Sequence, residues 1–299
     1  MNGVLIIDKP AGLTSHDAVD RVRRILRERS VGHLGTLDPL ATGVLPLVVG
    51  NMTRLAQFYT SSEKTYEGVI RFGFATDTYD ADGKPSGPEQ PVSLSFEQVR
   101  QLASQFRGVI EQMPPPFSAK KIQGVPAYKL ARKQKEVTLQ PVQVEVKEFE
   151  ILSTENACAH FRARVSSGTY MRTVAHDMGQ QMGCGAHLAS LRRIALAEFS
   201  LSDAHTLDQL QAASVNDSAE GFFVHPRQIL PEFPCVTATA EMIARIRSGR
   251  TVNLPELSRA RRVKVFHGQR ELIAIATRVA GTLFHAKLVL AAEPQIAKT

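Results

Sequence analysis

The chain has 299 residues, of which 43% are hydrophobic and 22% charged, and its formal net charge is +7. This length is enough for one large domain and one small domain. No apolar run approaches the roughly 20 residues of a spanning helix, and the run at 4–7 is too short for a secretory signal, so we expect neither a membrane protein nor a secreted one. The three cysteines are odd in number and widely spaced, which favours neither a disulfide framework nor a zinc site and indicates a cytoplasmic protein.

The N-terminal segment predicts a short strand at 4–7, a turn, and a helix that begins at Thr14 or Ser15. Apolar residues of this helix recur at the spacing of one helical face. Five arginines between positions 21 and 29 occupy the rest of its surface. Such a helix usually presents a solvated face, and contact with RNA is the alternative that the sequence leaves open.

Strands outnumber helices in the next 150 residues, and turns or single helices separate them. The expected elements are an irregular loop at 31–43, a strand at 44–49, a short helix at 52–59, a strand at 64–74, a polar connection at 77–91, a helix at 96–106, a strand and a lysine-rich helix around 127–133 after three prolines, strands at 142–152 and 159–165, and a helix at 170–182. Together they predict the α+β class, with a mixed, mainly antiparallel sheet flanked by helices.

The C-terminal region differs from the rest in pattern and charge. Residues 200–235 show little periodicity and are interpreted as a tether. A helix at 240–247 and short strands at 262–266, 272–278 and 282–290 then predict a small β-barrel. Residues 240–299 hold eleven Lys and Arg against four Glu, which is the whole surplus of seven positive charges. This distribution indicates a module that holds a phosphate backbone, although a merely basic, soluble surface is an alternative.

The segment 32–46 is the most informative part of the chain. It places three glycines, two prolines and two threonines around Asp38 and His33, which specifies the backbone more closely than an ordinary linker requires. An Asp-Pro pair in a turn is by itself more often structural than catalytic. The chain contains no G-x-G-x-x-G, no P-loop and no His or Cys cluster at metal spacing, so we expect no nucleotide or metal cofactor.

The segment resembles the catalytic motif of the TruB family of tRNA pseudouridine synthases, G-H-x-G-T-L-D-P-x-A-x-G-x-L, and every fixed position of that motif is present. Four further boxes follow the family order: Asp8-Lys9-Pro10-x-Gly12, Lys64-Thr65-Tyr66, Ser167-Gly168-Thr169-Tyr170-x-Arg172 and Gly185-Ala186-His187-Leu188-x-x-Leu191-Arg192-Arg193. The resemblance implies a catalytic domain at 1–230, with the pseudouridine synthase fold, and a PUA-like RNA-binding barrel at 236–299. It also implies that the enzyme converts the uridine at position 55 in the T-loop of tRNA to pseudouridine.

The resemblance assigns Asp38 as the catalytic carboxylate. This carboxylate can attack C6 of uracil or C1′ of ribose, or it can start proton abstraction from the sugar, and the sequence does not choose among these routes. Arg172 is implied as the ion-pair partner that lowers the pKa of Asp38, and Tyr170 belongs to the same box. Arg54 is a possible second basic group near the site.

Three further side chains are implied to act on the base. Tyr66 would stack on the uracil and help to remove the C5 proton, where simple core packing would be the default for a buried aromatic. His33 would fill the space left by the flipped nucleotide. Leu191 would pack against the bound base. The implied partner is the T stem-loop of tRNA, without a cofactor, a membrane or a guide RNA, and the expected enzyme is a monomer.

Other readings remain open at this point. The loop could belong to an RNA-binding or RNA-folding protein without catalysis, although binding alone does not need a carboxylate beside phosphates. Relatives that act in guide-RNA particles carry basic extensions, which are not evident beyond about residue 290. A retaining glycosidase would need a second carboxylate about 5 Å from the first, and no motif supplies one.

Overall fold

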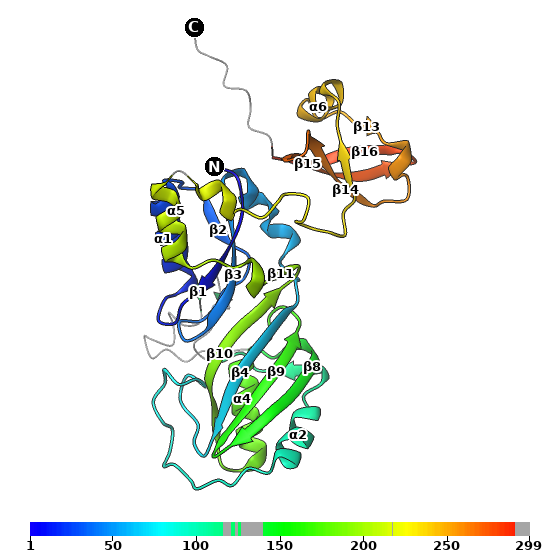
Figure 1. Cartoon of the computed structure of the whole chain (residues 1–299). Helices are drawn as coiled ribbons and strands as arrows, with labels where there is room; N and C mark the ends of the chain where they lie inside the picture. The colour runs from blue at the N-terminus through cyan, green and yellow to red at the C-terminus, as the bar shows by residue number, and fades with distance from the viewer. Residues whose placement is uncertain (116–120, 123–124, 127–139, 217, 291–299) are drawn as a thin grey trace.

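The computed structural model describes residues 1–115, 121–122, 125–126, 140–216 and 218–290. Within these residues, most of the molecule is built on one nine-stranded sheet, and a separate five-stranded sheet forms the C-terminal part (Figure 1). The main path of the large sheet is β1-β3-β10-β4-β9-β8-β5, with β2 paired to β3 and β11 paired to β10. Its strands are β1 (Gly3–Lys9), β2 (Val31–His33), β3 (Thr42–Val49), β4 (Lys64–Phe72), β5 (Gly108–Gln112), β8 (Val142–Glu155), β9 (Cys158–Val165), β10 (Ala186–Leu196) and β11 (Phe199–Ser200).

The expected α+β class, with a mixed and mainly antiparallel sheet, is confirmed. All pairs in the large sheet are antiparallel except β3 with β10, which meet over two residue pairs only. Helices flank the sheet at both ends: α5 packs on β1 and α1 packs on β2, whereas α4 packs on β10 and α2 packs on β8 (Figure 1). The helices of this part are α1 (Ser15–Leu26), the 3-10 helix η1 (Gly50–Phe58), α2 (Phe96–Ser104), α4 (Met171–Met182), the 3-10 helix η2 (Leu201–Asp203), α5 (Leu207–Val215) and the 3-10 helix η3 (Ala219–Phe222).

Local sequence explains where α1 begins. Thr14 is its N-cap: the Thr14 hydroxyl accepts a hydrogen bond from the backbone N–H of Asp17, and the Asp17 carboxylate accepts one from the N–H of Thr14. This capping box satisfies two backbone donors that the first turn would otherwise leave free. The expected apolar face is buried through Val19, Val22 and Leu26.

The interpretation of 200–235 as a tether is wrong for its first half. Thr206 caps α5, and Leu207, Leu210 and Ala213 are buried where this helix packs against α1 and β1. Farther along, the N–H of Val224 donates to the carbonyl of Val4. The missed signal was the capping box formed by Thr206 and Gln209, followed by apolar residues at helical spacing.

Four strands of the large sheet were also missed: the short strands β2, which lies in the expected irregular loop at 31–43, and β11, and the strands β5 and β10. The central strand β10 contains a His and two arginines, and charged residues at these positions mask the apolar alternation of a buried strand. The edge strand β5 is short and mostly exposed, so it leaves almost no pattern. A minimal hairpin, β6 (Lys121–Ile122) and β7 (Val125–Pro126), follows the prolines, whereas the expected lysine-rich helix at 127–133 lies outside the described residues.

The C-terminal sheet has the order β12-β14-β15-β16-β13, in keeping with the expected small barrel. Its elements are β12 (Cys235–Thr237), α6 (Ala240–Arg247), β13 (Val252–Asn253), the 3-10 helix η4 (Pro255–Leu257), β14 (Arg262–His267), β15 (Glu271–Ala280) and β16 (Leu283–Val289). The expected helix at 240–247 is confirmed, and the three expected strands are confirmed to within two residues at each end. The short strands β12 and β13 were not anticipated.

The two sheets share one apolar cluster. Phe266, Ile275 and Leu288 from the C-terminal sheet belong to the same buried cluster as Val4 and Tyr59 from the large domain. Figure 1 shows the C-terminal sheet against the end of the molecule that carries the N-terminus and η1. None of the helices within the described ranges has the length and apolar character needed to cross a membrane.

Candidate active site

The loop that carries Asp38 connects β2 to β3 and is held on both sides of the carboxylate. Before Asp38, the N–H and carbonyl of Leu37 both bond to the buried Ser15 hydroxyl, at 2.8 and 3.1 Å. After it, the carbonyl of Pro39 accepts from the N–H of Gly12 at 2.9 Å. Because the backbone is fixed at both neighbours, the carboxylate has a defined position before any substrate binds.

Arg193 is the main anchor of this loop. Its guanidinium is fully buried and donates to the carbonyls of Gly35 at 2.9 Å, Thr36 at 3.2 Å and Val44 at 2.7 Å. Arg193 also lies directly opposite Tyr66 in the pairing of β10 with β4. Five fixed donors in one plane suit such a cluster of carbonyls. Arg193 therefore ties the loop of Asp38 to strand β10, next to the tyrosine of β4.

Three charged side chains form the polar centre of the site. The Nε atom of Arg172 lies 3.0 Å from Oδ2 of Asp38, and Nη1 of the same guanidinium lies 3.4 Å from Oδ2 of Asp80. The carbonyl of Thr78 accepts from Arg172 Nη1 at 3.2 Å. The side chains of Arg172 and Asp80 are 6% and 7% exposed, whereas that of Asp38 remains 39% exposed. The open carboxylate is thus the one that a substrate can reach.

The pKa of Asp38 differs in direction from the sequence-based expectation. Its pKa is raised, because the surrounding protein removes water from the carboxylate more effectively than the Arg172 and Lys9 cations compensate, and Asp80 adds repulsion. The expectation that Arg172 lowers this pKa holds for its own contribution, but the net direction is upward. The raised pKa makes this carboxylate more basic than an ordinary aspartate.

Lys9 is a second buried cation behind the loop. Its ammonium donates to the carbonyls of Pro10 at 2.9 Å, Leu13 at 2.6 Å and Pro39 at 3.4 Å. Burial lowers the pKa of Lys9 to about 8, although the negative charge of Asp38 acts in the opposite direction. Lys9 fixes the backbone next to Asp38 and contributes positive potential to it.

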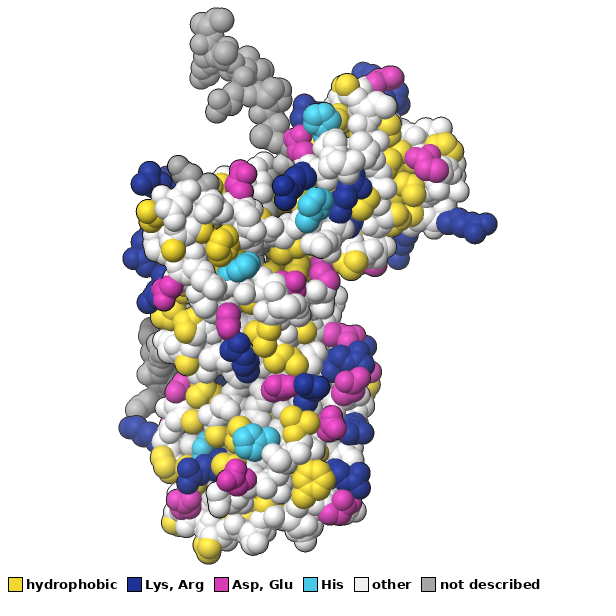
Figure 2. Space-filling view, viewed as in Figure 1, with side chains coloured by type: hydrophobic (Ala, Val, Ile, Leu, Met, Phe, Trp, Pro, Cys, Tyr) yellow, Lys and Arg dark blue, Asp and Glu magenta, His cyan; other side chains and the backbone are white. Residues whose placement is uncertain are grey.

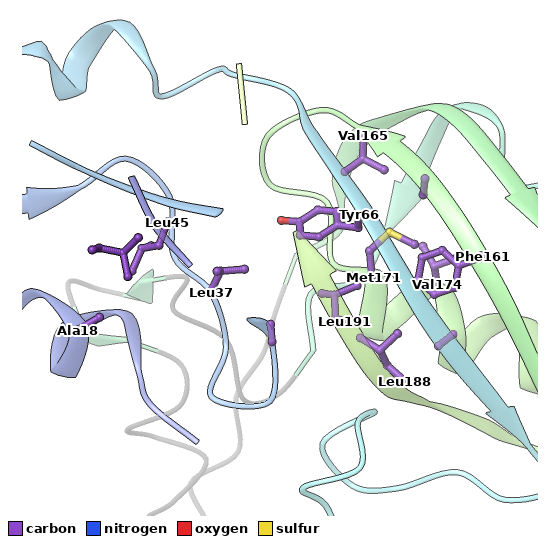
Figure 3. Packing of buried hydrophobic residues seen from close by; sticks show 14 of the residues in the cluster. Ala18, Leu37, Leu45, Tyr66, Phe161, Val165, Met171, Val174, Leu188 and Leu191 are labelled. Carbon is purple, nitrogen blue, oxygen red and sulfur yellow. The ribbon is translucent and has the colours of Figure 1, made fainter. Parts of the chain in front are cut away.

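Tyr66 and Leu191 form the apolar wall beside the carboxylate. Both are buried members of the cluster that also contains Leu37 and Met171, the neighbours of Asp38 and Arg172 in the chain. Figure 3 shows the Tyr66 ring projecting from β4 toward the segment of Leu37, with Leu191 close to it on β10. The structure thus brings Asp38, Arg172, Tyr66 and Leu191 into one site.

Tyr170 stands directly before α4 and is fixed from behind. Its N–H donates to Oε1 of Gln112 at 2.8 Å, and its carbonyl accepts from Nε2 of Gln112 at 3.0 Å. Gln112 is buried at the end of β5. This pair of bonds sets the start of the helix that presents Arg172.

His33 is the last residue of β2 and precedes the catalytic loop. Burial lowers its pKa, with smaller contributions from the charges of Arg193 and His16, so the ring is neutral at pH 7. Its Nδ1 atom is buried without a hydrogen-bond partner among the residues that the structure describes. A neutral ring of this kind can stack on a base.

Arg54 lies away from the Asp38 ion pair. It lies on η1, and its guanidinium donates to the carbonyl of Val289 at 2.6 Å, while the neighbouring Asn51 donates to the carbonyl of Leu290 at 3.0 Å. The structure therefore holds Arg54 at the junction with the C-terminal sheet and does not bring it to the Asp38 ion pair.

Sequence reasoning missed four residues that build the site: Lys9, Asp80, Gln112 and Arg193. Lys9 and Arg193 stood inside boxes that were quoted for the resemblance, but a buried cation that bonds only to carbonyls leaves no periodic signal. Asp80 lay in a segment interpreted as a polar connection. Among the residues described by the structure, no group of three or more His, Cys, Asp and Glu side chains could hold a metal ion.

Comparison with known proteins gives a consistent result. Residues 23–171 match the model of the TruB family pseudouridylate synthase N-terminal domain, and residues 172–231 match that of the tRNA pseudouridylate synthase B C-terminal domain. The tRNA pseudouridine synthase B of Solibacter usitatus is 48% identical over 97% of this chain and all of its own length. That of Aquifex aeolicus is 44% identical over 70% of this chain and 73% of its own. A crystal structure of a Cbf5-Nop10-Gar1 complex shares the fold, with a TM-score of 0.72 at 23% identity over 97% of this chain and 85% of that one.

Proposed function

The chain belongs to the TruB family of pseudouridylate synthases and is a tRNA pseudouridine synthase, and we propose that its target is the uridine at position 55 in the T-loop, with Asp38 as the catalytic carboxylate. The observation that carries this assignment is the ion pair between Asp38 and Arg172, in which the carboxylate alone stays open. The buried side chains of Lys9, Arg193 and Gln112 hold the backbone segments that carry Asp38 and Arg172.

The reaction is an isomerisation, so the site must break one bond and form another without losing the base. The bond between N1 of uracil and C1′ breaks, the ring turns, a bond between C5 and C1′ forms, and the C5 proton leaves to a base. Asp38 attacks C6 or C1′ or begins with proton abstraction from the sugar, and each route uses an open carboxylate with a raised pKa. Tyr66 stacks on the uracil and helps to remove the C5 proton, while Leu191 packs against the ring. Arg172 keeps the carboxylate oriented.

Access to the base requires that the nucleotide leave the T-loop stack. His33 lies at the edge of the catalytic loop, and its neutral, half-buried ring suits a stacking partner for the bases that extrusion leaves behind. Tyr170 completes the substrate surface at the start of α4.

Residues 1–230 form the catalytic domain in this proposal, and residues 236–299 form a PUA-like RNA-binding domain. The T stem-loop is the recognised element, because single-stranded loops with splayed bases are the usual targets of specific RNA readout. The enzyme acts as a monomer in the cytoplasm, without a guide RNA.

The test uses an unmodified tRNA transcript, without added cofactor, and maps pseudouridine along the product. Modification confined to position 55, and retained on an isolated T stem-loop of about 17 nucleotides, is the expected result. A transcript with 5-fluorouridine at the target should form a long-lived complex, since fluorine cannot leave C5 as a proton. Modification at another position, or none on the stem-loop, would contradict the proposed target. A protein that binds the transcript but forms no pseudouridine would be an RNA-binding or RNA-folding protein.

A further inference from the structure

A stacked ring pair joins the segment of Asp80 to the helix of Arg172. The rings of Tyr79 and His176 lie 3.8 Å apart between centroids, at an angle of 15°. Tyr79 directly precedes Asp80 in the chain. His176 lies four residues after Arg172 on α4, so the two side chains share one helical face. The stack therefore bridges the two elements whose charged groups meet at the Asp38 ion pair.

The backbone at Tyr79 adopts a conformation that needs support. Its φ is +65°, in the left-handed region that residues other than Gly, Asn and Asp seldom occupy. Its carbonyl accepts from the N–H of Leu188 on β10 at 3.0 Å. The hydroxyl of Thr78 donates to Oδ1 of Asp80 at 2.5 Å, and that of Thr76 donates to the Asp80 carbonyl at 2.7 Å. A strained residue inside a fully bonded turn persists because its surroundings determine it, and here the ring stack is part of those surroundings.

Tyr79 and His176 interact through the faces of two uncharged rings. Burial lowers the pKa of His176, so the imidazole is neutral at pH 7. Burial raises the pKa of the Tyr79 hydroxyl, with a smaller contribution from the Asp177 carboxylate. The Nδ1 atom of His176 is buried and has no hydrogen-bond partner in the described part of the chain. A neutral stacked pair of this geometry stabilises through ring contact.

We propose that Tyr79 and His176 are positioning residues for Arg172. By holding the segment of Thr78 and Asp80 against α4, the stack fixes the two acceptors of Arg172 Nη1 and so keeps Nε directed at Asp38. The inference rests on the proposed function, because the ion pair is what the stack serves. Tyr79 and His176 would act on Asp38 only through Arg172.

The experiment separates ring contact from backbone effects. Tyr79→Asn removes the ring but tolerates positive φ, whereas Tyr79→Phe keeps the ring and removes only the hydroxyl. His176→Ala and His176→Phe form the matched pair on the helix. For each variant we would measure the single-turnover rate of pseudouridine formation at saturating enzyme, and separately the Kd for tRNA.

The expected result is a rate lowered about 10- to 100-fold in Tyr79→Asn and His176→Ala, with Kd within about threefold of wild type, because small misplacements of catalytic groups act on the chemical step. Tyr79→Phe and His176→Phe should keep most of the wild-type rate. A raised Kd with an unchanged rate would overturn the inference and make the rings an RNA contact. A full rate in Tyr79→Asn, or a decrease shared equally by Tyr79→Phe, would overturn it as well.

A crystal structure of Tyr79→Asn provides a readout that does not depend on the reaction. We expect Arg172 to move away from Asp38, and an unmoved guanidinium would contradict the positioning role. If wild type formed no pseudouridine at position 55 while Arg172 still moved in the variant, the proposed target would fail and the structural inference would stand.

Discussion

Asp38 lies where the surrounding protein raises the pKa of its carboxyl, and this has a consequence for stability. A folded-state pKa above the unfolded value means that the native state binds more protons between the two values, so the stability from this group falls as pH rises through that window. Asp38→Asn removes the charge and should therefore raise Tm slightly at pH 7, while turnover falls below about one hundredth of wild type. Calorimetry and a single-turnover assay check the two halves. A lower Tm would mean that the ion pair with Arg172 is net stabilising.

The same carboxyl predicts the acid limb of the pH–rate profile. If Asp38 acts in its ionised form, as proposed, its raised pKa means that activity should begin to fall at a pH above the ordinary range of aspartate. Asp80→Asn should move this limb to lower pH, because it removes a repulsive charge and leaves more of the Arg172 field for Asp38. The measurement is the single-turnover rate from pH 4 upward. The exposed Asp82, a weaker contributor, is the control, and Asp82→Asn should move the limb less. An acid limb that moves up in Asp80→Asn would contradict this account.

Arg193 and Arg192 are neighbours in the chain, but we expect their replacement to lower the free energy of unfolding by very different amounts. Arg193→Met would remove a fully buried donor from three backbone carbonyls, which we expect to lower the free energy of unfolding by at least about 3 kcal/mol. Arg192 is 41% exposed and pairs with Asp8 at the surface, so Arg192→Met should cost less than about 1 kcal/mol. Denaturant unfolding of both variants tests the difference. Equal costs would show that the buried bonds of Arg193 contribute little.

At the scale of secondary-structure elements, the close approach of β3 to β10 depends on a glycine. Gly43 has a φ of +98°, and a Cβ there would lie 2.2 Å from the carbonyl oxygen of Arg193, in the parallel pairing of the two strands. Gly12 has a φ of +80° with open space around it. Gly12→Ala should therefore cost only the backbone strain of about 1–2 kcal/mol. Gly43→Ala should cost more and also lower the single-turnover rate, because it separates Arg193 from the loop. A Gly43→Ala variant as stable and active as Gly12→Ala would show that the strands can shift apart freely.

Sequence reasoning worked where a single element or motif carries the signal. The helices α1, α2, α4 and α6 and the long strands β8 and β9 follow local periodicity, and the loop of Asp38 was found by its composition and motif. It failed where the information lies in tertiary partners. The strand β10 is central because β3 and β4 pair with it, despite its charges, and the net direction of the Asp38 pKa depends on how much protein surrounds the loop. The place of Arg54 follows from a contact with Val289, 235 residues away.

At the scale of the whole molecule, the positive charge is uneven. Residues 240–299 hold the whole positive surplus, and Figure 2 shows several Lys and Arg side chains, with a few acidic ones, over the C-terminal sheet. Replacing Arg247, Arg250, Arg259 and Arg261, all exposed, by Gln should weaken tRNA binding and flatten its salt dependence. The slope of log K against log salt should fall by roughly 0.7–0.9 for each phosphate that the variant no longer neutralises.

Arg100 and Lys147 provide the matched control for this prediction. Both are exposed on the large domain, and both already pair with glutamates. Their replacement by Gln should leave the salt slope unchanged. If the C-terminal replacements also left it unchanged, the basic surplus would lie away from the bound RNA. Point substitutions are preferable to truncation after residue 235, because the C-terminal sheet shares its apolar cluster with the large domain.

That shared cluster also sets an order of events during synthesis. Val4 and Tyr59 are made early, but Phe266, Ile275 and Leu288, which cover them, come near the end, and Asn51 bonds a residue 239 positions later. At about 5–20 residues per second, the ribosome needs roughly 10 to 50 s to supply these partners. From the completion of β11 at residue 200 until the C-terminal strands follow, the nascent chain carries an uncovered apolar face on an otherwise complete sheet. Premature termination between β11 and β14 would therefore release a polypeptide with the loop of Asp38 assembled and this apolar face exposed, which chaperones would bind and proteases would degrade.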